Sequence, residues 1–154
     1  MSNFTIEQLE ELAAAGLPTP AVNQVEFHPF LYQKELLAYC DSNSIQLMAY
    51  SPLGAGAPVG GSSLLDHPTI LELAATHSRS PAQVLVRWSV QLGVVCIPKS
   101  TDPTRIGQNL DAFSWELSAA DMEKVASLDL GHRFTRGFVE GQWFDEGELT
   151  GAKL

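Results

Sequence analysis

The sequence predicts an α/β protein built around a parallel sheet. Three short apolar runs, partly β-branched, recur at 21–28, 45–53 and 93–100, and each is followed by a segment with helical spacing of its apolar residues. This alternation is typical of βαβ units, whose crossover helices make successive strands run parallel. With 154 residues, 45% hydrophobic and 18% charged, the chain has the composition of one globular domain.

The first half of the chain opens with a helix rather than a strand. Thr5 is the expected N-cap and Gln8 stands at capping-box distance from it. The first apolar run then leads to a helix over 34–43, where apolar residues follow helical spacing. A regular series of βα units starts on a strand, so this order indicates a partial series.

The second apolar run precedes two predicted helices. One opens at Pro68, and the other at Pro81 after Ser80, with Gly93 near its end. Serine at the N-cap, proline at the first helical position and glycine past the last turn are the usual boundary signals.

The third apolar run is also followed by two helices. Asp102 is the expected cap of the first, and Ser118 with Asp121 forms a capping-box-like pair at the start of the second. A glycine-rich stretch at 54–66 is long for a βα loop, and such loops are usually functional lids or disordered. The tail from Gly131 is expected to be irregular, with aromatic residues that pack over another part of the chain.

Composition and charge exclude several classes of function. The formal charge of −9 and the pI near 4.7 oppose binding of nucleic acid or an anionic membrane. No apolar run is long enough to span a bilayer and no secretory leader is recognised, so we expect a cytoplasmic protein. Cys40 and Cys96 lie in apolar stretches and are expected to be buried free thiols, and no histidine pair has metal-ligand spacing, so no metal site is predicted.

Polar residues follow each predicted strand, where an α/β protein binds its ligand. They are Gln24, Glu26 and His28 after the first strand, Tyr50 and Ser51 after the second, and Lys99, Ser100 and Thr101 after the third.

The third group predicts an anion site. It combines a positive charge, two hydroxyls and the start of a helix with its free backbone N–H groups. Arg105, Gln108 and Asn109 lie at i, i+3 and i+4 on one face of that helix, so they can reach one ligand together. Neither a P-loop nor a dinucleotide fingerprint of the GxGxxG type is present.

Four motifs in order make the chain resemble the C-terminal half of an aldo-keto reductase. They are SNF at 2–4, NQVEFHP at 23–29, AYSPLG at 49–54, and IPKS at 97–100 followed by RIGQN at 105–109. This family comprises NADP(H)-dependent (β/α)8-barrel enzymes that interconvert carbonyls and alcohols. The resemblance therefore implies a partial TIM-type barrel: about three β/α units with a leading helix over 1–130, and an irregular tail resembling a substrate loop over 131–154.

The resemblance also implies a role for each candidate cofactor residue. Ser2, Asn3 and Gln24 resemble the residues that hydrogen-bond the nicotinamide carboxamide, and Tyr50 resembles the tyrosine that stacks on the ring. Ser51 and Leu53 resemble pyrophosphate contacts. The remaining set resembles the 2'-phosphate and adenine site: Lys99, Ser100 and Arg105 on the phosphate, Thr101 nearby, and Gln108 and Asn109 facing the adenine.

Several positions depart from the family pattern. Gln108 replaces a frequent glutamate, and Asp102 would repel the 2'-phosphate unless its carboxylate caps the helix, which leaves NADP or NAD open. Ala55 and Ala57 lack the polar groups that latch the cofactor in some relatives, so cofactor release is expected to be fast.

The family's catalytic Asp, Tyr, Lys and His lie before the SNF motif, so no catalytic residue is assigned in this chain. We expect an NADP(H)-dependent carbonyl reductase of which this chain is the cofactor-binding part, inactive alone. The alternatives are a non-catalytic NADP(H)-binding or interaction module and a sequence whose start is mis-set. In the complete enzyme the partner is a small carbonyl or alcohol substrate, for which Phe138, Trp143 and Phe144 are weak pocket candidates. A parallel sheet of three strands has two unpaired edges and an uncovered apolar inner face, which predict self-association.

Overall fold

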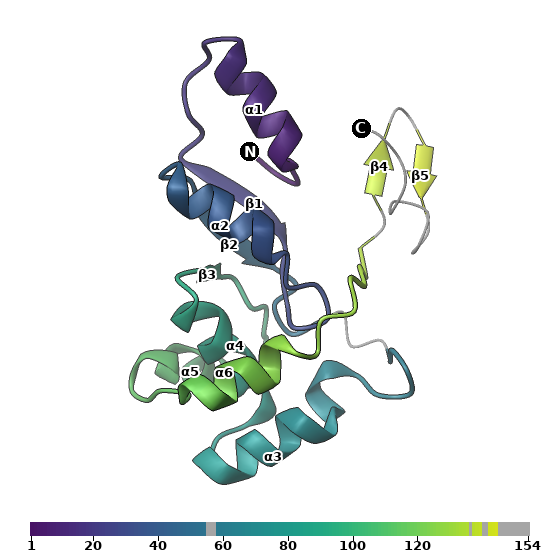
Figure 1. The fold of residues 1–154 in the computed structure, drawn as a ribbon. Coiled ribbons are helices and arrows are strands. Elements are labelled where there is room, and N and C mark those ends of the chain that lie inside the picture. Colours follow the sequence, from purple (N-terminus) through teal and green to yellow (C-terminus); the bar gives the residue numbers. More distant parts are fainter. Residues whose placement is uncertain (55–57, 136, 140–141, 145–154) are drawn as a thin grey trace.

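A three-stranded parallel sheet forms the centre of the computed structural model (Figure 1). The structure describes residues 1–54 and 58–135, together with the short strands at 137–139 and 142–144. The sheet contains β1 (Val22–Glu26), β2 (Gln46–Tyr50) and β3 (Val95–Cys96), hydrogen-bonded in the order β1-β2-β3 with both pairings parallel. This confirms the α/β class and the parallel sheet expected from the three apolar runs.

The helices begin where the local signals predict. Thr5, Ser80 and Ser118 each form a complete capping box, while Asp102 and His67 cap their helices through one side-chain hydrogen bond each. Such caps satisfy backbone N–H groups that have no partner within the helix. The helices of the described chain are α1 (Ile6–Ala14), α2 (Lys34–Ser42), α3 (Pro68–His77), α4 (Pro81–Gln91), α5 (Pro103–Leu110) and α6 (Ala119–Ala126), with 3-10 turns at η1 (Leu64–Asp66) and η2 (Asp111–Phe113).

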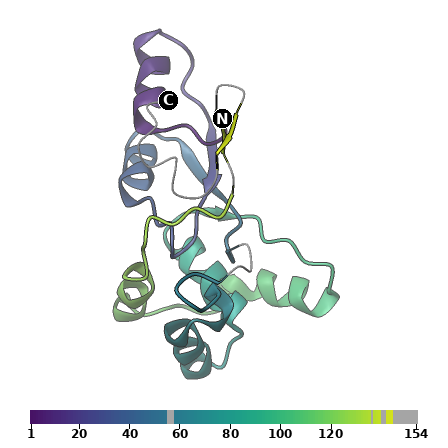
Figure 2. The ribbon, with the colours of Figure 1, turned by 90° about the vertical axis from the view of Figure 1, so that its right-hand side faces the viewer.

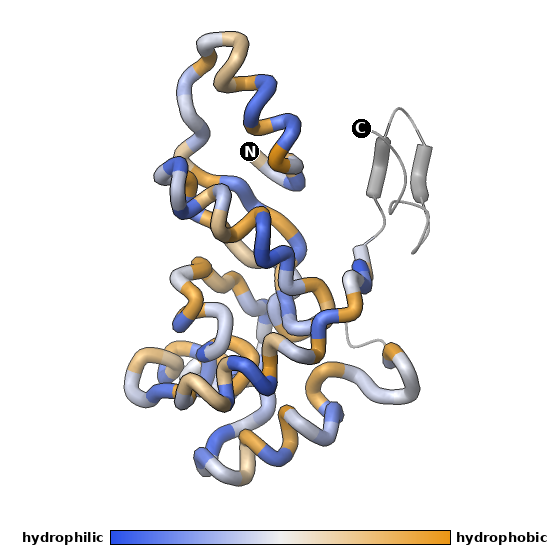
Figure 3. Tube along the Cα trace, in the orientation of Figure 1, coloured by the Kyte–Doolittle hydropathy of each residue, from blue (hydrophilic) through white to orange (hydrophobic). Residues whose placement is uncertain are grey.

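One face of the sheet is buried beneath the helices. Its strands contribute Val25, Leu47 and Ala49, all at most 2% exposed. Trp88 of α4 is fully buried and stacks on Phe27, with ring centroids 5.5 Å apart. The helices carry both hydrophobic and hydrophilic residues along their length, as expected when only one side of a helix meets the core (Figure 3). Truncating a buried aromatic of this kind typically costs about 3–5 kcal/mol.

The opposite face of the sheet has no such cover. Because side chains alternate along a strand, the pairing register assigns one set to this face. We call it the open face, and it consists of Gln24, Glu26, Met48, Tyr50, Val95 and, just past β3, Ile97. Val95 and Ile97 are 41% and 44% exposed, as the expected uncovered inner face requires.

The edges of the sheet differ from the expectation of two unpaired strands. The backbone of Met1 to Asn3 runs parallel to β1: Gln24 N–H donates to Met1 O at 2.9 Å, and Asn3 N–H donates to Gln24 O at 2.8 Å. This pairing occupies much of the β1 edge. At the other edge, β3 is shorter than the run at 93–100, and the last ladder hydrogen bond runs from Ile97 N–H to Ala49 O at 3.2 Å.

The chain that leaves α6 crosses the carboxyl end of β1. Leu130 N–H and His132 N–H both donate to Phe30 O, at 3.2 and 2.8 Å. In Figure 2 this yellow-green segment passes between the part that carries α1 and α2 and the part that carries α3 to α6. We call residues 133–135 the strap. Phe134, within the strap, is 9% exposed, which confirms for this residue that an aromatic of the tail packs onto the body of the protein.

Glu26 holds the strap through its buried carboxylate. Phe134 N–H donates to Oε1 at 2.6 Å and Thr135 N–H donates to Oε2 at 3.0 Å. His28 Nε2 lies 2.9 Å from Oε1 and Arg133 Nη1 lies 3.9 Å from Oε2. The side chains of Glu26 and His28 are both 0% exposed. A charge so buried is stable only with such partners.

The tail beyond the strap is not wholly irregular. It contains a two-stranded antiparallel pair, β4 (Gly137–Val139) with β5 (Gln142–Phe144), which corrects the expectation of an irregular tail. The aromatic and β-branched residues of these segments favour strands. The side chains of Phe138, Trp143 and Phe144 lie outside the described residues.

The cysteines differ in burial. Cys40 is fully buried, but Cys96 is only half-buried, because β3 is an edge strand without a neighbour on its outer side. Burial raises the pKa of the Cys96 thiol to about 11, with a hydrogen bond to Ser89 acting in the opposite direction. A thiol with this pKa is not nucleophilic at neutral pH. None of the helices described here has the length and hydrophobicity that crossing a bilayer requires.

The Glu26 carboxylate makes the fold sensitive to acid. Its burial raises the pKa, but the hydrogen bonds from His28, Phe134 and Thr135 outweigh that effect, and the net pKa lies below the usual value for glutamate. A group whose pKa is lowered on folding adds stability above its unfolded pKa, about 4.3, and loses it as pH falls through the folded value. We predict a loss of unfolding free energy below about pH 4, measured by urea denaturation at a series of pH values. Glu26→Gln, which cannot titrate, should show a smaller loss, and equal losses in both proteins would contradict this assignment.

Candidate functional site

The candidate residues of the first two strands meet at the carboxyl end of the sheet. Tyr50 OH donates to Asn3 Oδ1 at 3.1 Å, and Asn3 is itself tied to Gln24 by the backbone hydrogen bond described above. Gln24 Nε2 contacts Met48 Sδ at 3.2 Å across the sheet. Ser2 forms a parallel bridge with Gln24 and is exposed. These four candidates, Ser2, Asn3, Gln24 and Tyr50, therefore form one connected group.

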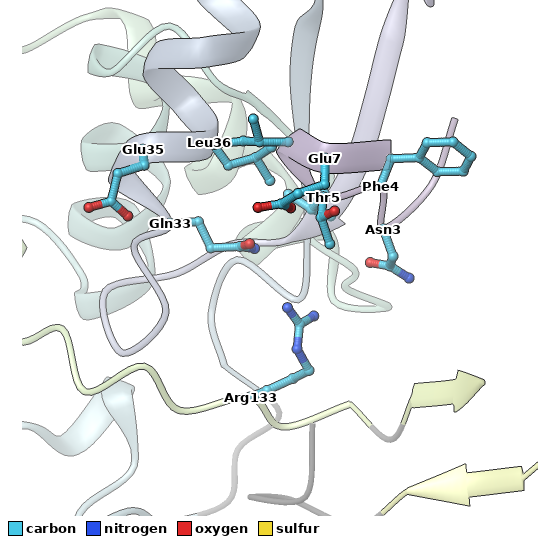
Figure 4. A pocket seen from close by; sticks show the side chains of 10 residues that line it. Asn3, Phe4, Thr5, Glu7, Gln33, Glu35, Leu36 and Arg133 are labelled. Atoms are coloured by element: carbon cyan, nitrogen blue, oxygen red, sulfur yellow. The ribbon is translucent and has the colours of Figure 1, made fainter. Parts of the chain in front are cut away.

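Asn3 also lines a cavity of about 300 Å³ beside this group. Figure 4 shows the Arg133 side chain pointing from the strap toward the side of the cavity lined by Thr5 and Gln33. Glu7 and Glu35, each in the first turn of its helix, add two carboxylates to the wall. The hydrogen bond from the backbone of Glu7, followed by one from Thr5, lowers the pKa of that carboxyl. Its charge is therefore kept at neutral pH.

The turn after β2 brings Ser51 and Leu53 to the same end of the sheet. Ser51 has φ of 50° and Gly54 has φ of 70°, and Gly54 N–H donates to Ser51 O at 2.9 Å. A Cβ on Gly54 would lie 3.1 Å from a Leu64 methyl carbon and 3.2 Å from the Phe134 ring. Glycine is required here both for the left-handed backbone and for the close approach of the strap. Ala55 and Ala57, which lack the polar groups that hold the cofactor in some relatives, lie outside the described residues.

The third group lies between β3 and α5, and Asp102 organises it. Asp102 Oδ1 accepts a hydrogen bond from Arg105 N–H at 3.0 Å, and its own N–H donates to Ser100 Oγ at 3.2 Å. The backbone N–H groups of Arg105 and Thr104, in that order of strength, lower the pKa of the Asp102 carboxyl. The N–H groups that the sequence suggested for anion binding are thus partly used by Asp102, because aspartate is a strong N-cap.

Positive and polar side chains remain available around that cap. Lys99, Thr101 and Arg105 are exposed, while Ser100, Gln108 and Asn109 are half-buried. Lys99 takes part in no ion pair within the described part of the chain. Since Ser100 Oγ already accepts from Asp102 N–H, its hydroxyl proton is free to be donated. The group can therefore offer hydrogen-bond donors to an anion.

The sheet order relates the three groups to one another. The carboxyl ends of parallel strands lie along one edge, so the groups after β1, β2 and β3 follow each other in that order. An elongated ligand could contact all three. Over the described residues, no group of three or more His, Cys, Asp or Glu side chains is arranged to hold a metal ion.

The strap was missed by reasoning from sequence. Arg133 and Phe134 reach the candidate site through Glu26, and the Glu26–Phe134 hydrogen bond joins residues 108 positions apart. No local pattern signals such a contact. The one available hint was a strand-end carboxylate in an otherwise apolar segment, since a buried charge requires partners.

Comparison with known proteins identifies the family. Residues 1–130 match the sequence model of the aldo/keto reductase family. Aldo-keto reductase family 1 member A1-A of Danio rerio is 42% identical over 138 residues, covering 87% of this chain and 43% of that protein. Glyoxal reductase of Bacillus subtilis is 47% identical over 133 residues, covering 86% of this chain and 46% of that protein.

A solved structure of the same family has a similar fold. MGS-M4, an aldo-keto reductase enzyme from a Medee basin deep-sea metagenome library, superposes with a TM-score of 0.79 at 36% identity, over 87% of this chain and 48% of its own. The chain thus spans less than half the length of these relatives, and its open sheet corresponds to part of their barrel. On the family match and the shared fold together, the chain belongs to the aldo/keto reductase family.

Proposed function

We propose that this chain supplies the NADP(H)-binding part of an oxidoreductase that reduces aldehydes or ketones to alcohols. The observation that carries the proposal is the arrangement at the start of α5. Lys99 and Arg105 are exposed there, Ser100 has a free hydroxyl proton, and Asp102 is engaged as the helix cap. These residues stand where the family motif has its 2'-phosphate contacts.

The cap role of Asp102 supports NADP(H) over NAD(H). A carboxylate free to face the ligand would repel the 2'-phosphate, since like charges a few ångströms apart oppose each other. Here the carboxylate is turned toward the backbone N–H groups of Thr104 and Arg105. Two cations and a hydroxyl then face the phosphate, and arginine is well suited to bind it through two parallel hydrogen bonds.

The other candidate residues fit the remaining length of the cofactor. Gln108 and Asn109 would contact the adenine, with Thr101 near the phosphate, and Ser51 and Leu53 would contact the pyrophosphate. Ser2, Asn3 and Gln24 would hydrogen-bond the carboxamide, and Tyr50 would stack on the nicotinamide. The Tyr50–Asn3 hydrogen bond supports this division, because it orients both side chains before a ligand arrives.

The bound cofactor would supply the hydride, and this chain's residues would hold and orient it. The substrate is proposed to be a small carbonyl compound; one relative is by name a glyoxal reductase. Residues 1–130 are proposed as the barrel part and 131–154 as the substrate-loop part. Phe138, Trp143 and Phe144 remain proposals for the substrate pocket.

A second candidate function is a non-catalytic NADP(H)-binding or interaction module. The exposed apolar side chains beside β3 and along α5 favour it: Val95 and Ile97 on the open face, and Leu110 and Phe113, which are 71% and 75% exposed. Exposed apolar side chains of this kind could contact another protein segment.

Removing the phosphate contacts should weaken NADPH binding selectively. We expect Lys99→Ala and Arg105→Ala each to raise the Kd for NADPH by about tenfold to a hundredfold, the value of a hydrogen bond to a charged group. The Kd for NADH, which lacks the 2'-phosphate, should change little. Titration monitored by protein fluorescence measures both constants.

Lys124→Ala is the matched control for that experiment. Lys124 is an exposed lysine of α6 that pairs with Glu72, so its loss removes a positive charge away from α5. It should leave both Kd values unchanged. A wild-type chain that binds no NADPH at about millimolar concentration would overturn the proposal.

Turnover by the 154-residue chain alone is not expected. By the family resemblance, the catalytic Asp, Tyr, Lys and His belong to strands before the SNF motif, so hydride transfer would lack its proton donor. NADPH oxidation should stay at the rate in buffer across a panel of aldehydes that includes glyoxal. Any rate clearly above buffer would contradict this expectation.

Self-association is the expected consequence of the open face and the β3 edge. An exposed edge strand and an uncovered apolar face both favour pairing with another chain. Gel filtration should therefore give an apparent mass above 16.7 kDa that rises with concentration. Val95→Lys, which adds a charge at the edge, should lower it, and a concentration-independent monomer would contradict the prediction.

A further inference from the structure

The Glu26 carboxylate connects β1 to the strap, next to the hydrogen bonds from Leu130 and His132 to Phe30 O. Both of its oxygens accept backbone N–H groups of the strap, at 2.6 and 3.0 Å, and its own backbone carbonyl accepts Gln33 Nε2 at 2.6 Å. A fully buried charge costs several kcal/mol unless hydrogen bonds compensate it. The two hydrogen bonds from the strap compensate this buried charge, and they hold the strap in place.

The strap lies near the turn after β2 and lines the same cavity as Asn3. Glu26 and Tyr50 are register partners on the open face. The Phe134 ring lies against Gly54, in the turn that carries Ser51 and Leu53. Arg133, the preceding residue, lines the same cavity as Asn3. The strap thus borders the proposed pyrophosphate turn on one side and the proposed carboxamide group on the other.

Only a carboxylate meets the requirements of this position. Two N–H donors approach from the strap, so the side chain must offer an acceptor to each. Glutamine has one acceptor oxygen, and its amide NH2 would face the second donor. The neighbouring His28 and Arg133 add positive or donor groups, and no second carboxylate forms an ion pair with either of them in the described structure.

We propose that Glu26 is a positioning residue of the nicotinamide end of the cofactor site. By holding the strap, it keeps the Phe134 ring against Gly54 and Arg133 beside Asn3. The strap is thereby held at the proposed nicotinamide end of the site. This inference rests on the proposed function, and it assigns Glu26 no contact with the cofactor itself.

The experiment compares two ligands in wild-type and Glu26→Gln proteins. NADPH contacts the whole site, whereas adenosine 2',5'-bisphosphate reports only the part near Lys99, Arg105 and α5. We expect Glu26→Gln to raise the Kd for NADPH about tenfold, because the strap loses a hydrogen bond to a charged group and no longer holds the site in its binding conformation. The Kd for the bisphosphate should stay unchanged. If Glu26 had only a structural role, its replacement would weaken the binding of both ligands or of neither.

Amide hydrogen exchange provides the second readout. The N–H groups of Phe134 and Thr135 should exchange about tenfold or more faster in Glu26→Gln, while those of Val25 and Met48 in the β1–β2 pair keep their rates. Glu35→Gln is the matched control, because it removes an exposed carboxylate from the same cavity without touching the strap. It should behave as wild type in both measurements.

Failures of the two proposals can be told apart. If the wild type binds neither ligand, the proposed function falls, and the positioning role falls with it. If the wild type binds both ligands and Glu26→Gln matches it, or weakens both equally, only the positioning role is overturned. Should Glu26→Gln fail to fold, Phe134→Ala takes its place, since it keeps the Glu26–His28 pair and the strap's backbone N–H groups and removes the ring that packs against Gly54 and His28. Phe134→Ala should raise the Kd for NADPH and leave the Kd for the bisphosphate unchanged. An unchanged Kd for NADPH would overturn the inference.

Discussion

The stacking of Trp88 on Phe27 joins α4 to the sheet, and the rest of the molecule is arranged around that contact. Seven successive residues of α4, from Gln83 to Ser89, are buried, so this helix is enclosed on nearly all sides. It covers one face of the sheet and leaves the other without helices. A parallel sheet normally has both faces covered. Here the second face carries Gln24, Tyr50 and Glu26, so the polar groups proposed to bind the cofactor occupy the surface that the core does not use.

Helix boundaries were predictable because their signals are local. Thr5 with Gln8, Ser80 with Gln83 and Ser118 with Asp121 are each three residues apart, and the hydrogen bonds that define the caps form within that distance. Features that depend on distant partners were not predictable. The pairing of Met1 to Asn3 with β1 depends on residues about twenty positions away. The sequence also did not reveal the β4–β5 pair, which lies in a tail whose aromatic residues were interpreted only as packing groups.

In the candidate site, too, local features could be predicted from the sequence and features that depend on distant residues could not. Polar residues at strand ends, and the spacing of Arg105, Gln108 and Asn109, could be found from sequence, because strand order and helix periodicity fix where they lie. The sequence left open whether the Asp102 carboxylate caps the helix, and the structure shows that it does, by accepting a hydrogen bond from Arg105 N–H. The contribution of Arg133 and Phe134 could not be found, since it depends on how the chain returns after α6. A carboxylate in an apolar strand showed that a partner was needed, but not which residue would provide it.

The separation in sequence between Glu26 and the strap has a consequence for the order of folding. The pairing of β1 with β2 closes a loop of about two dozen residues, whereas the Glu26–Phe134 hydrogen bond joins residues 108 positions apart. Contacts between distant residues repay their loop-closure entropy only after the intervening chain is ordered. We therefore expect the strap to dock last, onto a sheet that is already formed. The strap and the turn around Gly54 would then be the last region to reach its native conformation and the first to lose it.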